Sequence, residues 1–128
     1  METILLVEDE ASLRVLILEI LESAGYRVLE GPTPEEALTL AGAHAEPIHL
    51  VLTDVVLPRM SGRQMAESLQ SSRPDTRVLF MSGYTDDAIS HHGILETGVH
   101  FLQKPFTTDA LLRKVRDVLD APVGVGPS

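Results

Sequence analysis

The chain has 128 residues, of which 44% are hydrophobic, enough for one domain with a single packed core. Its formal net charge of -9, with only ten Lys and Arg, argues against a surface that binds nucleic acid. The absence of cysteine excludes disulfides and thiolate metal ligands, and the apolar stretch near the N-terminus is too short for a signal-peptide core or a membrane span. We therefore expect a soluble, cytoplasmic domain that contacts neither nucleic acid nor a membrane directly.

Short apolar runs alternate along the chain with segments of helical periodicity, a pattern typical of repeated βα units around a parallel sheet. The apolar runs predict strands over residues 4–7, 26–30, 49–53, 78–81 and 100–103. The periodic segments predict helices over residues 10–24, 34–41, 61–71, 86–95 and 107–119. Residues 1–120 are expected to form one domain, and residues 121–128, rich in Gly and Pro, a flexible tail or linker.

The predicted helices differ in how clearly the sequence marks them. The first ends before Gly25, which supplies a left-handed stop, and its predicted buried face consists of Leu13, Leu16, Ile17, Ile20 and Leu21. The segment 86–95 is the weakest helix and is expected to be mobile, because it contains the poor helix formers His91, His92 and Gly93.

Two helices have explicit start signals. Thr33 is a predicted N-cap that precedes Pro34 at the first helical position, with Glu36 as its capping-box partner. Ser61 and Gln64 have the same spacing and predict a second capping box. Both helices are therefore expected to begin at these residues.

The alternation of five strands with five helices leaves few topologies, because crossovers between parallel strands are right-handed. The flavodoxin-like order 2-1-3-4-5 fits best, in a single α/β domain with helices on both faces of a parallel five-stranded sheet. Ligands of such sheets bind beyond the carboxyl ends of the strands, at the switch point between the first and third strands. We expect the functional site at that edge.

Four of the five predicted strands end in residues of complementary chemistry. Glu8 and Asp9 follow the first strand, Asp54 the third, Ser82 the fourth and Lys104 the fifth. Each residue alone has a plainer explanation, since acids favour the first turn of a helix and Asp and Ser are common in turns. Their joint occurrence on one edge instead predicts a site at which Asp54 accepts a phosphoryl group.

Phosphoryl transfer requires mainly positioning and charge neutralisation from a protein. Asp54 is the predicted oxygen nucleophile, and a Mg²⁺ ion held by neighbouring acids would cancel its repulsion of phosphate. Lys104 would supply a positive charge to one phosphoryl oxygen and Ser82 a hydroxyl donor to another. Because three crowded acids repel one another, millimolar Mg²⁺ is expected to raise the melting temperature.

Four motifs resemble the receiver domain of two-component response regulators. They are LLVEDE at 5–10, LTDVVLPRMSG at 52–62, MSGY at 81–84 and FLQKPF at 101–106, and the resemblance covers about residues 3–119. It implies that Asp54 takes a phosphoryl group from a histidine of a sensor kinase or of a histidine phosphotransfer domain. It also implies a Mg²⁺ site, with Mn²⁺ able to take its place, whose ligands are Asp9, Asp54, the Val56 backbone carbonyl and, through water, Glu8.

The same resemblance implies a conformational switch. Ser82 corresponds to the hydroxyl that moves onto the phosphoryl group, and Lys104 to the lysine that contacts it. The bond between Lys104 and Pro105 is often cis in the family. Phe101 corresponds to the aromatic residue whose rotation marks the active state. The face that changes consists of the fourth strand, the fourth helix, the fifth strand and the last helix. A homodimer through the last three of these elements is compatible with the resemblance.

Some positions depart from the commonest family pattern. Glu8 stands where Asp is common, which lengthens the arm to metal-bound water, and Phe101 stands where Tyr is frequent. Val56 and Tyr84 occupy positions that tune the phosphoryl lifetime in the family. Because an apolar Val56 cannot orient an attacking water, slow self-dephosphorylation is expected.

Other functions fit the residues less well. A haloacid-dehalogenase-type phosphatase also uses Asp, Mg²⁺, a hydroxyl and Lys, but Val56 stands where its general acid would be. A flavodoxin-like flavin module would need a phosphate loop where residues 8–10 are acidic, and the five histidines show no zinc-ligand spacing, so we expect them to be solvated or packed on strands. A receiver that works without phosphorylation is disfavoured by the complete set of site residues.

The parent protein is a separate question from the domain. The motifs resemble the C-terminal receivers of hybrid sensor histidine kinases, and a stand-alone single-domain regulator is the alternative. In either case the domain is expected to catalyse only its own phosphorylation and dephosphorylation and not to be an enzyme otherwise.

Overall fold

Five parallel strands form one sheet in the order β2-β1-β3-β4-β5, as predicted. The computed structural model of the chain describes residues 2–55, 57, 60–83 and 100–121. The elements are β1 Thr3–Val7, α1 Ala11–Ser23, β2 Arg27–Gly31, α2 Pro34–Ala43, β3 Leu50–Asp54, α3 Gly62–Ser72, β4 Arg77–Gly83, β5 Phe101–Lys104 and α5 Thr108–Asp120. The predicted helix over 86–95, Val56, Tyr84 and the tail beyond residue 121 lie outside the described residues.

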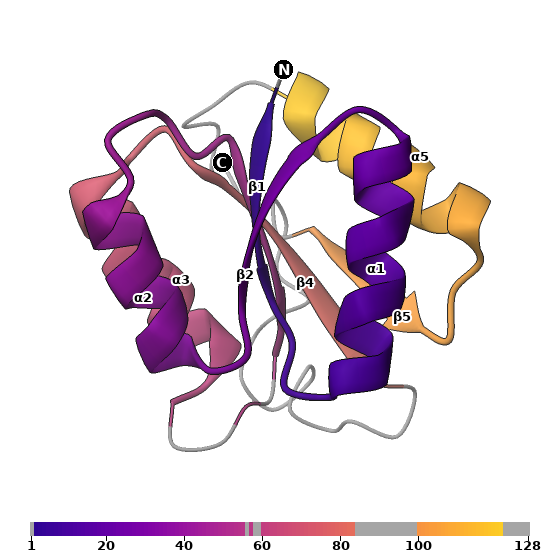
Figure 1. Cartoon of the computed structure of the whole chain (residues 1–128), viewed down its shortest axis with the longest axis horizontal. Coiled ribbons are helices and arrows are strands. Elements are labelled where there is room, and N and C mark those ends of the chain that lie inside the picture. The colour runs from indigo at the N-terminus through magenta and orange to yellow at the C-terminus, as the bar shows by residue number, and fades with distance from the viewer. Residues whose placement is uncertain (1, 56, 58–59, 84–99, 122–128) are drawn as a thin grey trace.

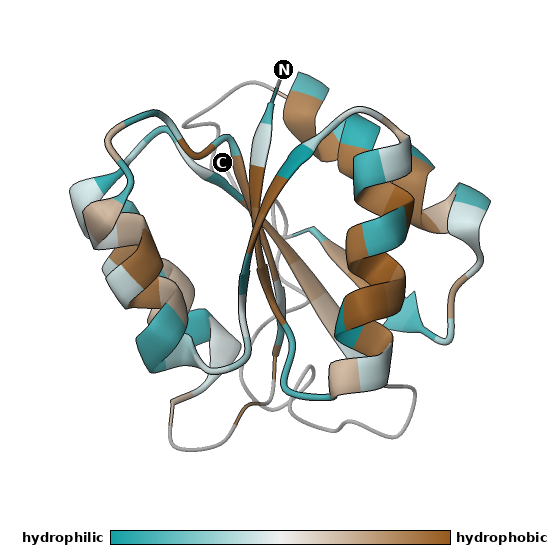
Figure 2. Cartoon of the chain, in the orientation of Figure 1, coloured by the Kyte–Doolittle hydropathy of each residue, from teal (hydrophilic) through white to brown (hydrophobic). Residues whose placement is uncertain are grey.

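Helices cover both faces of the sheet. Figure 1 shows α1 and α5 on one face and α2 and α3 on the other. Alternate residues of β1 serve the two cores: Ile4 and Leu6 pack in the cluster with α1 and α5, and Leu5 and Val7 in the cluster with α2 and α3. Such strands are apolar on both sides, which explains their continuous apolar runs in the sequence. Figure 2 shows these hydrophobic strands between helices that carry both polar and apolar residues.

Helix α1 departs from its predicted buried face at Leu16, whose exposed fraction is 52%. Ile17 and Leu21 are fully buried, and Leu13 and Ile20 pack partly against the core. Because each residue turns the helix by about 100°, Leu16 lies beside this stripe rather than in it. It lines an open groove of about 330 Å³ between α1 and α5. The prediction that Leu16 is buried was therefore wrong.

The helix starts largely follow their sequence signals. Ser61 and Gln64 form a complete capping box at α3. At α2 the Thr33 hydroxyl accepts a hydrogen bond from the Glu36 backbone N–H at 3.1 Å. The second bond of a capping box, from the N-cap backbone N–H to the side chain three residues later, is found within the described residues only at α3. Gly25 ends α1 with φ +97°, the predicted left-handed stop. No helix within the described part of the chain is long and apolar enough to cross a membrane.

Candidate functional site

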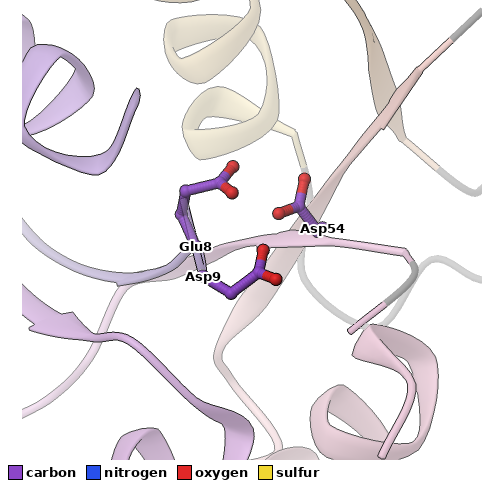
Figure 3. Close-up of side chains that lie close together, drawn as sticks. All are labelled: Glu8, Asp9 and Asp54. Atoms are coloured by element: carbon purple, nitrogen blue, oxygen red, sulfur yellow. The ribbon is translucent and has the colours of Figure 1, made fainter. Parts of the chain in front are cut away.

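Three carboxylates meet at the carboxyl edge of the sheet. Glu8 and Asp9 directly follow β1, and Asp54 is the last residue of β3, the neighbouring strand in which Thr53 pairs with Val7. One carboxylate oxygen from each of the three residues lies within 4.8 Å of the other two. Figure 3 shows the side chains converging from the two strand ends. The predicted juxtaposition of Glu8, Asp9 and Asp54 is thus present in the structure.

Lys104 reaches this cluster from β5, on the far side of β4. Its Nζ lies 2.5 Å from Asp54 Oδ1 and 3.0 Å from Glu8 Oε1. The Glu8 and Asp54 side chains are almost fully buried, and that of Lys104 is one-quarter exposed. The peptide bond between Lys104 and Pro105 is cis, the isomer frequent in the family that the sequence resembles. One cation therefore neutralises part of the charge of two buried carboxylates.

Ser82 lies on β4, between the strands that carry Asp54 and Lys104, and Phe101 lies on β5 with Lys104. Ser82 is buried in β4, one residue after Met81, which pairs with Asp54. Phe101 begins β5 opposite Phe80 and packs partly against a small core cluster. Ser82 is thus at the same edge as the acids, whereas Val56 and Tyr84 fall outside the described residues.

The electrostatics of Asp54 are those of a crowded acidic site. The pKa of Asp54 is raised to about 8: burial is the largest cause, the Glu8 carboxyl also raises the pKa, and Lys104 opposes the shift. Burial by itself lowers the pKa of Lys104, but the Asp54 and Glu8 carboxylates beside it more than offset this, so that the pKa of Lys104 is raised. Without a further cation, the site therefore retains a proton at neutral pH.

The donor set fits a hard divalent cation. Mg²⁺ takes oxygen ligands and usually keeps several of its waters, so two or three protein carboxylates suffice to hold it. Glu8, Asp9 and Asp54 provide such oxygens, and the exposed Asp9 leaves the cluster open to solvent. Within the described residues this is the one group of acids and histidines that could hold a metal ion.

His49 confirms part of the prediction for the histidines. Its Nδ1 accepts a hydrogen bond from the Thr3 backbone N–H at 2.9 Å, so the ring is packed against the start of β1. His91 and His92 lie outside the described residues.

Two residues near the cluster have no role in the sequence-based prediction. An ideal Cβ on Gly62 would lie 1.7 Å from the Asp54 backbone oxygen, so α3 begins directly against the end of β3. The Arg14 guanidinium donates to the Glu8 backbone oxygen at 2.9 Å. Gly62 follows a helix cap, where glycine looks like ordinary turn chemistry, and only an arginine early in α1 hinted at the second contact.

Comparisons with known proteins agree with the motifs. A family model described as "Response regulator receiver domain" matches residues 4–116. The response regulator receiver protein CpdR of Brucella abortus is 32% identical over 124 residues, covering 94% of this chain and 99% of that protein. The sensor kinase CckA of the same organism is 35% identical over 118 residues, which are 92% of this chain but only 12% of CckA.

Solved structures show the same likeness. The receiver domain of the hybrid histidine kinase CckA has a TM-score of 0.76 and 32% identity, covering 92% of this chain and 99% of that one. The chemotaxis protein CheY4 of Vibrio cholerae has a TM-score of 0.79 and 27% identity, covering 92% and 98%. Both pairs superpose over nearly the full length of the two chains.

Proposed function

The chain belongs to the response regulator receiver domain family, and on this premise we propose that Asp54 is the phosphoryl acceptor of a two-component phosphorelay. The observation that carries the proposal is the contact of a buried Asp54 with Glu8 and Lys104, beside Asp9, at the carboxyl edge of the sheet. Receiver domains are signalling domains, so the activity proposed for this chain is limited to its own phosphorylation and dephosphorylation.

The donor is a phosphohistidine of a sensor kinase or of a histidine phosphotransfer domain. An Asp54 oxygen forms a bond to phosphorus while the bond from phosphorus to the imidazole nitrogen breaks, and that nitrogen keeps the electron pair. The product is an acyl phosphate on Asp54. Bound Mg²⁺, or Mn²⁺ in its place, supplies the positive charge that offsets the repulsion between carboxylate and phosphate.

The residues around Asp54 divide the work. Asp9 and Asp54 would hold the metal directly, with the Val56 backbone carbonyl as a further ligand and Glu8 acting through water. Lys104, already 2.5 Å from Asp54, would transfer its contact to a phosphoryl oxygen. Ser82, buried on β4 between β3 and β5, would supply a hydroxyl donor to another phosphoryl oxygen.

Phosphorylation would then change the conformation of the chain. A hydrogen bond from Ser82 to the phosphoryl group forms in only one state, and a shift from mostly inactive to mostly active needs about 5.5 kcal/mol of such differential interaction. The half-buried Phe101, one strand away, would adjust its packing with it. Val56 and Tyr84 would set how long the phosphoryl group persists.

For the parent protein we favour the receiver of a hybrid sensor histidine kinase, with a stand-alone regulator as the alternative. The likeness to the sensor kinase CckA supports the first, and the almost complete coverage of CpdR supports the second. The reading frame upstream of Met1 discriminates between them, because a hybrid kinase would continue there into a kinase core.

Labelling with acetyl phosphate tests the acceptor. Wild type incubated with labelled acetyl phosphate and Mg²⁺ is expected to incorporate about one phosphoryl group per chain, and Asp54→Asn none, because the amide is a poor nucleophile. Asp75→Asn removes an exposed acid in a turn and should label like wild type. Chelation of Mg²⁺ should abolish the label. Undiminished labelling of Asp54→Asn would contradict the assignment.

Thermal melting tests the metal site independently. Mg²⁺ at ten times its dissociation constant is expected to stabilise the wild type by about 1.4 kcal/mol, a rise of several degrees in melting temperature. Asp54→Asn should lose most of this rise because it loses a charged ligand. A melting curve of the wild type that does not respond to Mg²⁺ would count against the site.

A further inference from the structure

We propose that Arg14 is a positioning residue for the acidic site: it holds the backbone between β1 and α1 so that Glu8 and Asp9 present their carboxylates beside Asp54. The inference rests on the proposed function, because it concerns the same metal site. Arg14 lies in α1, outside the four motifs on which the family resemblance depends.

The guanidinium of Arg14 joins the ends of two adjacent strands. Its Nη1 donates to the Glu8 backbone oxygen at 2.9 Å, and its Nε lies 3.2 Å from Glu30 Oε1. Glu30 pairs with Leu6 in the register of β1 and β2, so it sits close to the residue that follows β1. The Arg14 side chain is only 17% exposed. A planar group with two fixed donors therefore links the acidic loop to the rigid sheet.

The place of Arg14 in α1 is unfavourable for the helix itself. Its backbone N–H donates to the Glu10 oxygen and closes the first turn of α1. A positive charge there opposes the helix macrodipole, an effect that the acids Glu8, Asp9 and Glu10 at the same end of the helix offset in part. The contacts with the Glu8 carbonyl and with Glu30 give the arginine a specific role at this position.

Like-charge repulsion tends to separate the acidic side chains of the loop that Arg14 contacts. Glu8, Asp9 and Glu10 are three successive acids, and Glu10, the N-cap residue of α1, makes no side-chain cap bond. The other described bond that orders Glu8 locally runs from the Glu10 N–H to Glu8 Oε2 at 3.0 Å. By binding the Glu8 carbonyl, Arg14 fixes the peptide plane between Glu8 and Asp9. It thereby sets the direction in which both side chains leave the backbone.

Groups that orient metal ligands commonly change metal affinity by about 10- to 100-fold. For Arg14, this effect has the opposite sign to a simple charge effect. Removing a positive charge beside three carboxylates would by itself strengthen the binding of Mg²⁺. Loss of positioning would weaken it. The sign of the change in affinity therefore separates the two explanations.

The test is to titrate each purified variant with Mg²⁺ and to measure the binding affinity by calorimetry. Arg14→Met is expected to weaken Mg²⁺ binding about tenfold. Arg14→Lys keeps the charge but not both contacts, and it should weaken binding about fivefold. Arg27→Met is the matched control: it removes the same charge at the amino end of β2, where Arg27 pairs with the exposed Glu46, and should change Mg²⁺ affinity by less than about twofold.

A second measurement separates positioning from loss of fold. Labelling of Arg14→Met by acetyl phosphate should be slow at low Mg²⁺ and recover at saturating Mg²⁺, whereas that of Asp54→Asn should not recover at any concentration. If Arg14→Met does not fold, Arg14→Lys provides the same test, because it keeps the positive charge and loses one of the two contacts.

The outcomes distinguish the inference from the proposed function. Unchanged or tighter Mg²⁺ binding by the Arg14 variants, with a wild type that binds Mg²⁺ and is labelled at Asp54, would overturn the role of Arg14 and leave the proposed function standing. A wild type that neither binds Mg²⁺ nor accepts label would overturn both.

Discussion

Gly62→Ala is expected to lower the free energy of unfolding by at least about 2 kcal/mol. An ideal Cβ at Gly62 would lie 1.7 Å from the Asp54 oxygen and 2.8 Å from its carbonyl carbon. Both atoms belong to the backbone, so no change of rotamer relieves the overlap. Either the end of β3 or the start of α3 must move, and both are packed into the core.

Gly42→Ala is the matched control for this substitution. Gly42 lies in α2, and nothing is found within 4 Å of the place where its Cβ would be. Alanine is the better helix former, so this change should stabilise the chain by up to about 1 kcal/mol. Urea denaturation of both variants against wild type measures the two effects. Equal stabilities of Gly62→Ala and wild type would contradict the prediction, because they would show that the junction of β3 and α3 can shift to accommodate a Cβ at little cost in free energy.

Gly62→Ala should also slow the labelling of Asp54. The Gly62 N–H donates to the Val55 oxygen at 2.8 Å, and the Thr53 hydroxyl donates to the Asp54 oxygen at 3.1 Å. A Cβ at residue 62 would therefore disturb the hydrogen bonds that orient Asp54, the phosphoryl acceptor. A shift of its carboxylate by even 1 Å reduces phosphoryl transfer strongly, because the reaction depends on alignment. Labelling is best compared at a temperature where Gly62→Ala is folded by circular dichroism.

The strand order and the location of the acidic cluster could be predicted because both follow from patterns that a parallel sheet imposes. Each buried strand is a continuous apolar run, and the residue after it must lie at the carboxyl edge. Asp54 and Lys104 are 50 positions apart in number, yet each is the last residue of its strand, and their side chains meet. This prediction requires only that the end of each strand be located in the sequence.

Contacts that depend on distances within the site could not be predicted in this way. The family resemblance implies that Glu8 acts through metal-bound water, and nothing in the sequence indicated that its carboxylate also lies 3.0 Å from Lys104 Nζ. The tight approach of Gly62 to Asp54 depends on where α3 begins relative to β3, to within a fraction of an ångström. Leu16 has the spacing of a buried residue, yet it is half exposed and lines the open groove between α1 and α5. Periodicity gives the face of a helix but not the width of the stripe that its neighbours cover.

In the metal-free protein, the free energy of unfolding is expected to fall by about 2 kcal/mol between pH 6.5 and pH 8.5 because of Asp54 alone. Its carboxyl is buried, with a pKa of about 8 in the folded chain against an ordinary value of 3.8. Between these two values the folded state holds a proton that the unfolded state has lost. Stability is therefore highest when Asp54 is protonated and is lost as the pH rises through the folded pKa.

Comparison with Asp54→Asn isolates this contribution. The amide does not titrate, so its stability should be nearly independent of pH over the same range, and the metal-free variant should exceed the wild type most at pH 8.5. The other described group with a shifted pKa near this range acts in the opposite direction, since burial lowers the pKa of His100. The contribution of His100 to the free energy of unfolding rises with pH, mostly below pH 7. This contribution is the same in the wild type and in Asp54→Asn, so it cancels in the comparison. Parallel pH profiles for the two proteins would show that Asp54 does not hold the proton.

Mg²⁺ should remove this dependence on pH, because a metal and a proton compete for the same carboxylates. Glu8, Asp9 and Asp54 must be ionised to act as ligands, and below pH 8 part of the binding free energy is used to displace the proton from Asp54. At a fixed, near-saturating Mg²⁺ concentration, the gain in stability should therefore be greater at pH 8.5 than at pH 6.5 by about 2 kcal/mol. Urea denaturation with and without Mg²⁺ at the two pH values measures this difference. If Mg²⁺ stabilised the chain equally at both, the proton would be held away from the metal ligands, and the acceptor of the phosphoryl group would already be ionised at rest.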